Sequence, residues 1–423
     1  MALAFAAPIS GGASAEASRL RTFRPDIQGL RAVAIILVVF GHAGAPLLGG
    51  VDLSFVISGF IMTSQLDREQ ERSGKISFGK FYARRARRLL PMATLVTLVT
   101  VLATWLIMPL KLRTVAWDAI CTALSVINYR LAGQGTDYVH LHTNASPLQH
   151  AWSLSVEEQF YLLWPLLLLG ALALGIKLGR RRLVAGILLA VVVVGSLGLS
   201  IVLTKLNQPL AYFGFQTRAW ELGIGALVAI CAKRLSQLPL WVAAAMSWVG
   251  LMFLLVTVVL VHRTTELPGY AVGGPVLGGA LVIIGGCANP KYGVEWVLGR
   301  ALPNFIGQLS YSWYLWHWPF FVLTPVALGM DLGLSGKVKL IVLTFVLSIC
   351  TYFWIEKPFR EHPNLKSLVA KPWRGLVMGV TFIATTVAAC TAVLTLTVPS
   401  GTKLTTPVSY VNPVLLASLV EQG

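Results

Sequence analysis

The chain has 423 residues, of which 56% are hydrophobic and 12% charged, and its mean hydropathy is +0.73. A soluble domain of this length cannot bury so much apolar side chain, so the composition excludes a soluble globular protein and indicates a lipid environment. The excess of 34 Lys and Arg over 17 Asp and Glu does not predict nucleic-acid binding, which needs a basic face on a soluble module. The five cysteines stand apart in apolar runs without zinc-ligand spacing, so no metal site is predicted.

Residues 1–23 are rich in Ala, Gly and Ser and lack the basic start of a secretory signal, so we expect a flexible cytoplasmic tail. Each membrane span needs roughly 20 mostly apolar residues. The shorter stretch 114–131 carries Asp118, Asn128 and Arg130, which favours an interfacial or re-entrant helix on the outer side. The sequence predicts an all-α, polytopic transmembrane helical bundle of about eleven spans, at 27–46, 50–66, 89–109, 156–176, 183–203, 217–232, 239–261, 272–288, 308–329, 338–356 and 375–398.

Basic residues set the predicted orientation, because Lys and Arg concentrate in cytoplasmic loops. Most of them fall in the N-terminal segment and in the loops after every second span, as in the GRRR run at 179–182. This pattern predicts a multi-pass protein of the inner (cytoplasmic) membrane with a cytoplasmic N-terminus and an extracytoplasmic C-terminus. The expected parts are a transmembrane domain at 24–363, a cytoplasmic connector with an additional transmembrane helix at 364–398, and an extracytoplasmic tail or linker at 399–423.

The first span contains two ionisable residues, which are costly at membrane depth and usually functional. Arg31 lies near its inner end and His42 beyond its middle. A tight Gly/Pro turn then returns Asp52 toward the level of His42. Because a neighbouring carboxylate fixes the tautomer of a His while the other ring nitrogen takes a proton, His42 and Asp52 are predicted to be catalytic. The alternatives are a packing role for His42 and an N-cap role for Asp52.

The segment SPLQHAWSLSVEEQFYLLWP places a polar cluster at the outer mouth of the fourth span. Adjacent helical residues point about 100° apart, so only one of Glu157 and Glu158 is expected to face the bundle easily. Both are candidate catalytic residues, and Ser153 and Tyr161 are candidate substrate-binding residues. A capping box, in which a Ser precedes a Glu at the start of the helix, is the competing interpretation.

The predicted inner loop GKFYARRARRLLP carries four arginines within five positions. Membrane orientation alone explains several of them. Arg85 and Arg88 lie one helical turn apart, which would also make a clamp for the phosphates of coenzyme A. Arg84 with Arg87 has the same spacing, so Arg84 is a further candidate for donor binding.

Three polar residues in later spans complete the candidate substrate-binding set. Arg218 and Glu221 lie three positions apart on one helical face, so a simple ion pair is the alternative. His317 stands about nine residues into its span, which is too deep for a residue of the membrane interface.

Seven segments resemble the motifs of the acyltransferase-3 family of integral membrane O-acyltransferases. In chain order, over residues 24–363, they are RPDIQGLRAVAIILVVFGHAG, GVDLSFVISGFIMT, FYARRARRLLP, HAWSLSVEEQFYLLWP, RAWELGIGALVA, LSYSWYLWHWP and IEKPFREHP. The resemblance implies a ten-helix core, to which 375–398 adds one helix, and transfer of an acyl group, usually acetyl, from coenzyme A to envelope sugars or lipids. It points to His42 and Arg31 as essential and to Arg85 and Arg88 as donor-binding. Some members continue into an SGNH-type domain, which the C-terminal tail would precede.

The sequence hypothesis is therefore an acyl-CoA-dependent O-acyltransferase that modifies an extracytoplasmic carbohydrate or glycolipid. His42, oriented by Asp52 or by a Glu of the EEQ segment, would either deprotonate the acceptor hydroxyl or carry the acyl group covalently. A succinyl donor is an alternative to acetyl, and a proton- or anion-coupled transporter is the rival class. No tightly bound cofactor and no nucleic acid are expected; the expected partners are acyl-CoA as cosubstrate, membrane lipid and the envelope acceptor.

Overall fold

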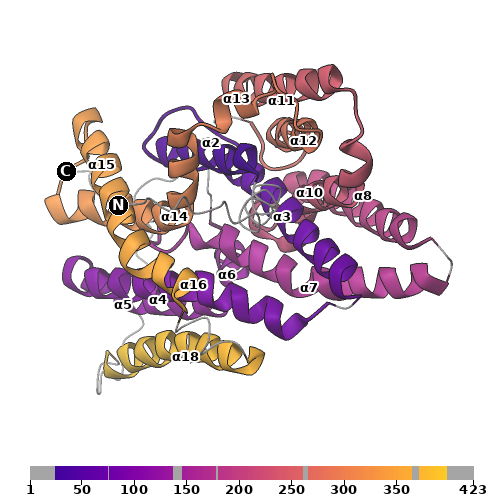
Figure 1. The fold of residues 1–423 in the computed structure, drawn as a ribbon. Coiled ribbons are helices and arrows are strands. Elements are labelled where there is room, and N and C mark those ends of the chain that lie inside the picture. Colours follow the sequence, from indigo (N-terminus) through magenta and orange to yellow (C-terminus); the bar gives the residue numbers. More distant parts are fainter. Residues whose placement is uncertain are drawn as a thin grey trace, which may run out of the picture.

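The computed structural model describes residues 24–74, 76–136, 145–177, 180–260, 265–363 and 371–397. Every regular element in these ranges is a helix (Figure 1), which confirms the predicted all-α class. The long helices are α2 (Pro25–His42), α3 (Gly50–Ser73), α4 (Phe78–Ile107), α7 (Ala151–Lys177), α8 (Arg181–Leu206), α10 (Phe215–Leu235), α11 (Leu240–Leu260), α12 (Gly273–Cys287), α14 (Ala301–Leu328), α15 (Leu334–Thr351) and α18 (Pro372–Leu396). Short helices are η1 (Pro109–Lys111), α5 (Leu112–Ala123), α6 (Ile127–Gly133), α9 (Gln208–Phe213), α13 (Glu295–Leu298), η2 (Tyr352–Glu356) and α16 (Lys357–Glu361).

Six helical stretches in the described chain are long and apolar enough to cross a membrane. They are α2, α4, α8, α11, α18 and the continuous run Leu334–Glu361. Helices α3, α10 and α14 reach 24, 21 and 28 residues, so they match the hydrocarbon thickness in length. A multi-pass membrane protein follows, whereas the count of eleven spans stays a prediction.

The stretch that was not expected to span, 114–131, falls on two short helices. Helix α5 has 12 residues and α6 has 7. At about 1.5 Å per residue, neither crosses about 30 Å of hydrocarbon. Its exclusion from the spans agrees with the structure.

Close backbone crossings hold the centre of the bundle together. Where α3 crosses α10, a Cβ added to Gly59 would lie 1.9 Å from the Leu222 carbonyl oxygen, and one added to Gly225 would lie 2.0 Å from that of Val56. Where α2 crosses α14, a Cβ on Gly307 would lie 1.9 Å from the Gln28 carbonyl oxygen. Small residues permit such approaches between membrane helices. Helix α2 also packs against α3, so it lies in contact with both α3 and α14.

The remaining long helices surround this centre. Helix α4 packs against α14 on one side and α18 on the other, and α7 contacts α3, α8 and α10. In Figure 1, α18 runs along the outside of α4, on the opposite side of the molecule from the pair α11 and α12. Helices α2, α3, α4, α7 and α14 thereby enclose a common space, which holds the candidate site.

Candidate active site

A cavity of about 940 Å³ opens between helices α2, α3, α4, α7 and α14. Its size lies at the upper end of the range for ligand and cofactor pockets, which is about 300–1,000 Å³. Apolar side chains of α2 and α3 and several hydroxyl groups form part of its wall. The basic lining residues are Arg31, Arg68, Arg72, Lys80, Arg84, Arg85, Arg87, Arg88 and Arg360, and the acidic ones are Glu69, Glu157 and Glu158.

The lining therefore carries nine basic side chains against three carboxylates. Two of the carboxylates are engaged: Glu69 with Arg84 at 3.2 Å and Glu158 with Arg85 at 2.6 Å. The basic excess remains after these pairs are formed. A cavity with such a balance is suited to a ligand that carries several negative charges.

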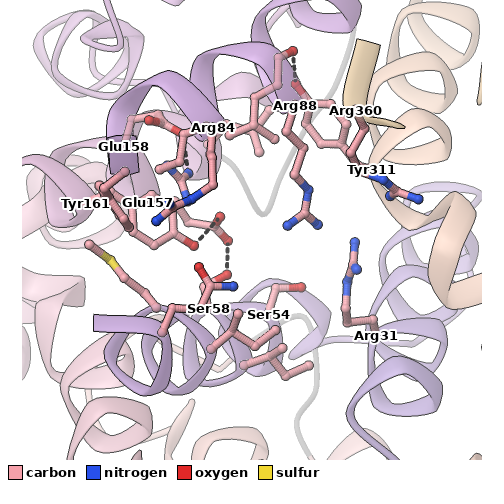
Figure 2. A pocket seen from close by; sticks show the side chains of 18 of the residues that line it. Arg31, Ser54, Ser58, Arg84, Arg88, Glu157, Glu158, Tyr161, Tyr311 and Arg360 are labelled. Carbon is pink, nitrogen blue, oxygen red and sulfur yellow. Dashed lines mark hydrogen bonds and ion pairs between the residues drawn. The ribbon is translucent and has the colours of Figure 1, made fainter. Parts of the chain in front are cut away.

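Arg31 and Arg88 are the clearest part of this excess. Arg31 donates to the Ser310 hydroxyl at 2.7 Å, and Arg88 makes no hydrogen bond or ion pair within the described chain, although its Nε is buried. Neither guanidinium contacts a carboxylate there. Figure 2 shows both pointing from opposite walls into the same space. Two facing guanidinium groups repel each other unless an anion lies between them, and their planar donors fit phosphate oxygens.

Arg85 and Arg88, the pair predicted to bind the donor, both line the cavity, but their side chains have different partners. Arg85 donates to Glu158, and its guanidinium carbon lies 3.3 Å from the centroid of the Tyr161 ring. Arg84 is half-exposed and pairs with Glu69. Of the two arginines in the predicted clamp, Arg88 is thus the one that makes no ion pair with a carboxylate in the described chain.

Both glutamates of the EEQ segment line the cavity, so the expectation that only one would face the bundle is wrong. Glu157 accepts from the Ser58 hydroxyl at 3.0 Å and from the Tyr161 hydroxyl at 3.4 Å (Figure 2). Glu158 accepts from Arg85. The physical reason is that the cavity extends over two neighbouring helices, α3 and α4, so two side chains about 100° apart both reach it.

The capping alternative for this segment is also excluded by the helix boundary. Helix α7 begins at Ala151, so Ser153 and Ser155 lie inside it. The Ser155 hydroxyl donates to the Ala151 carbonyl, and Ser153 Oγ lies 2.7 Å from the Tyr314 hydroxyl. Ser153 and Tyr314 line the end of the cavity nearest the histidines described next.

Three histidines gather beside that end. His42, the last residue of α2, has its Nδ1 2.9 Å from Nε2 of His317, which is completely buried in α14. The ring of His150 approaches the ring of His317 edge-on, at 5.8 Å between centroids. Trp318 contacts His42 from a third direction at 4.6 Å.

The expected partnership of His42 with Asp52 is wrong. Asp52 accepts from Arg218 at 2.9 Å, and no bond from Asp52 to His42 exists in the described chain. Helix α3 begins at Gly50, with Gly49 as its N-cap, so Asp52 does not cap it either. A buried guanidinium is far less stable without a carboxylate partner than a neutral imidazole is. Asp52 therefore pairs with Arg218 rather than with His42.

Arg218 and Glu221 form the pair that the sequence offered as an alternative to substrate binding. Their side chains are 2.8 Å apart and fully buried, and Arg218 also stacks near the rings of Tyr212 and Trp152. Neither residue lines the cavity. Because Arg218 also pairs with Asp52, these contacts link α10 to α3 and indicate a structural role for Arg218 and Glu221.

Sequence reasoning missed several residues of the cavity. Arg360 lines it from α16, beside the buried Glu356, which accepts from Ser312 at 2.6 Å. The signal was present in the segment IEKPFREHP, where charged residues directly follow an apolar span. Ser58 and Tyr314 carried no such signal, because a single hydroxyl in an apolar helix is common.

The fold and the cavity define a helical membrane protein with a large basic site beside a buried histidine pair. Residues 24–355 match the model of a family described as an acyltransferase domain. The chain belongs to this family, acyltransferase-3, as the sequence motifs suggested.

Named relatives agree with this assignment. The chain is 33% identical over 351 residues to "Putative peptidoglycan O-acetyltransferase YrhL" of Bacillus subtilis, covering 79% of this chain and 55% of the relative. It is 28% identical over 354 residues to peptidoglycan O-acetyltransferase OatA of Listeria monocytogenes, covering 81% of this chain and 56% of the relative. The chain thus spans little more than half the length of these relatives. No solved structure matches it.

Proposed function

We propose that the chain moves an acetyl group from acetyl coenzyme A, bound from the cytoplasmic side, to a hydroxyl of an extracytoplasmic envelope carbohydrate. The observation that carries the proposal is the continuity of the basic cavity, from the arginines of α3 and α4 to Ser153 and Tyr314 beside the histidines. Such a cavity suits a long donor with a polyanionic end and a reactive thioester at the other. The family assignment favours transfer over the rival transport reading.

The donor would lie along the cavity with its phosphates at the basic end. Arg31 and Arg88 would hold them, because these two guanidinium groups face each other across the cavity and neither pairs with a carboxylate in the described chain. The cavity also includes Arg68, Arg72 and Lys80, which flank the connection between α3 and α4. The basic residues favour a cytoplasmic side for this end of the two helices, which supports entry of the donor from the cytoplasm.

His42 would act on the acceptor hydroxyl at the other end. It takes the hydroxyl proton as the oxygen attacks the thioester carbonyl carbon; the carbon–oxygen bond forms, the carbon–sulfur bond breaks, and the proton passes to the departing thiolate. In the alternative route, His42 attacks first and carries the acetyl group before the hydroxyl takes it. Both routes consume one donor and release one free thiol for each ester formed.

The acceptor class follows from the names of the relatives, which are those of peptidoglycan O-acetyltransferases. We extend peptidoglycan to this chain as the first acceptor to test. The same names, which are those of O-acetyltransferases, give acetyl as the acyl group of the donor. Succinyl remains the alternative donor group, since its extra carboxylate would be a further anion for the basic cavity.

Purified protein in bilayers should release free thiol from acetyl coenzyme A over many turnovers only when an envelope glycan is added; the covalent route allows a single turnover without it. A His42→Ala variant that still binds donor should release none. Succinyl coenzyme A in place of acetyl coenzyme A tests the alternative acyl group. Thiol release that is independent of both the glycan and His42 would overturn the proposal.

A further inference from the structure

We propose that His317 is a positioning residue that fixes the tautomer of His42 and makes Nε2 of His42 the basic nitrogen. This inference rests on the proposed function, because it concerns how His42 accepts a proton. It replaces the carboxylate partner expected from the sequence by a neutral imidazole from α14. The argument depends on two contacts of His317 and on the relative orientation of the two rings.

The contact between the rings has the geometry of a hydrogen bond. The two nitrogens are 2.9 Å apart, the ring centroids are 5.2 Å apart, and the ring planes differ by 3°. The distance between the two nitrogens is shorter than the distance between the two centroids by the sum of the two ring radii. Both nitrogens therefore lie on the line that joins the centroids. The rings therefore lie edge to edge in nearly one plane, where the N–H of one ring and the lone pair of the other meet.

The second contact of His317 decides which ring donates. Nδ1 of His317 lies 3.2 Å from the carbonyl oxygen of Trp313, one helical turn earlier in α14. A carbonyl oxygen only accepts, so Nδ1 of His317 carries the proton. In a neutral imidazole the other nitrogen, Nε2, is then an acceptor. Nδ1 of His42 must supply the hydrogen of the bond between the rings.

The tautomer of His42 follows directly. With its proton on Nδ1, neutral His42 has its lone pair on Nε2, so Nε2 is the basic nitrogen of this tautomer. After proton uptake the imidazolium still donates Nδ1–H to His317, so the bond persists through the reaction. A triad carboxylate has the same orienting role toward its histidine. The full burial of His317 keeps water from competing for this bond.

Further polar and titratable groups lie around the pair. From α14 the phenol of Tyr314 packs beside His317, at 5.4 Å between ring centroids, and its hydroxyl donates to the His150 carbonyl. The residue before α7, His150, contacts His317 by its ring edge. From α15, Lys337 lies near Gly44, two residues beyond His42.

Three substitutions at His317 separate positioning from packing. His317→Gln keeps a side-chain oxygen that can accept from His42, His317→Leu fills the space without an acceptor, and His317→Glu provides a charged acceptor. The matched control is Thr344→Val, which removes another buried hydrogen bond of α14, that from Trp313 Nε1 at 3.2 Å. The assay is acceptor-dependent thiol release by full-length protein in bilayers, with coenzyme A binding measured in parallel.

We expect His317→Leu to lower kcat by about 100-fold or more, in the range seen when orienting partners of a reactive histidine are removed. His317→Gln should recover at least about tenfold of that loss, and Thr344→Val should resemble the parent. The KM for acetyl coenzyme A should not change, since His317 does not line the cavity. In His317→Glu the acid limb of the pH–rate profile should move to higher pH, because a carboxylate stabilises imidazolium.

The inference is overturned if His317→Leu and His317→Gln lose activity equally while both bind coenzyme A like the parent. It is equally overturned if His317→Leu retains parental kcat, or if His317→Glu leaves the pH profile in place. The proposed function fails separately, and only if the parent itself shows no acceptor-dependent release or if His42→Ala retains it.

Discussion

Replacement of Arg88 by Gln tests which arginine holds the donor. Arg88 is without a carboxylate partner in the described chain and shares the cavity with Arg31. A hydrogen bond to a charged group contributes about 1.5–3 kcal/mol, so loss of one such contact should weaken donor affinity by about 10-fold to about 100-fold. Thermal stability should change little, because the substitution breaks no hydrogen bond or ion pair of Arg88 in the described chain.

Arg85→Gln is the matched comparison, one helical turn away on the same helix. Its guanidinium is engaged with Glu158 and the Tyr161 ring, so its removal leaves a carboxylate without its partner. We expect a lower melting temperature for this variant and a smaller loss of donor affinity than for Arg88→Gln. Calorimetric titration with coenzyme A and a thermal melt in detergent measure both quantities. Parental donor affinity in Arg88→Gln, or a larger loss in Arg85→Gln, would refute the reasoning.

Three further outcomes follow from the structure. Asp52→Asn should lower the melting temperature while kcat stays within a few-fold of the parent, because Asp52 balances the buried Arg218; a dead but stable variant would return Asp52 to the catalytic site. Gly225→Ala should destabilise the protein, since the added Cβ would meet the Val56 carbonyl at 2.0 Å; an unchanged melt would contradict the crossing. Acetyl pantetheine, which lacks the nucleotide phosphates, should react with a higher KM than acetyl coenzyme A and show weaker salt dependence; equal KM values would remove the phosphate site.

Hydropathy predicted the helical class and the approximate places of the long helices, but not where those helices end. The second predicted span ends at 66, whereas α3 continues to Ser73; the third begins at 89, whereas α4 begins at Phe78. A hydropathy threshold detects the hydrocarbon layer only. Charged turns extend these helices beyond it, and the ion pair between Arg84 and Glu69 joins the two extensions.

The candidate residues were recognisable from the sequence because buried ionisable side chains are rare in membrane helices. Their partners were not. Asp52 is close to His42 in the chain, yet it pairs with Arg218, 166 positions away, and His42 meets His317, 275 positions away. Chain proximity and helix periodicity describe one helix or one turn at a time. The choice among partners is made by the crossings of α2, α3, α10 and α14, which depend on tertiary packing.

The most direct test of the central claim follows the acetyl group across the bilayer. Radiolabelled acetyl coenzyme A is supplied to the cytoplasmic face of sealed vesicles that contain the protein and enclose peptidoglycan fragments on the other face. We predict ester-linked label on the enclosed glycan, released by mild alkali, and none with His42→Ala. Label that stays on the donor side, or glycan labelling that persists without His42, would contradict the account.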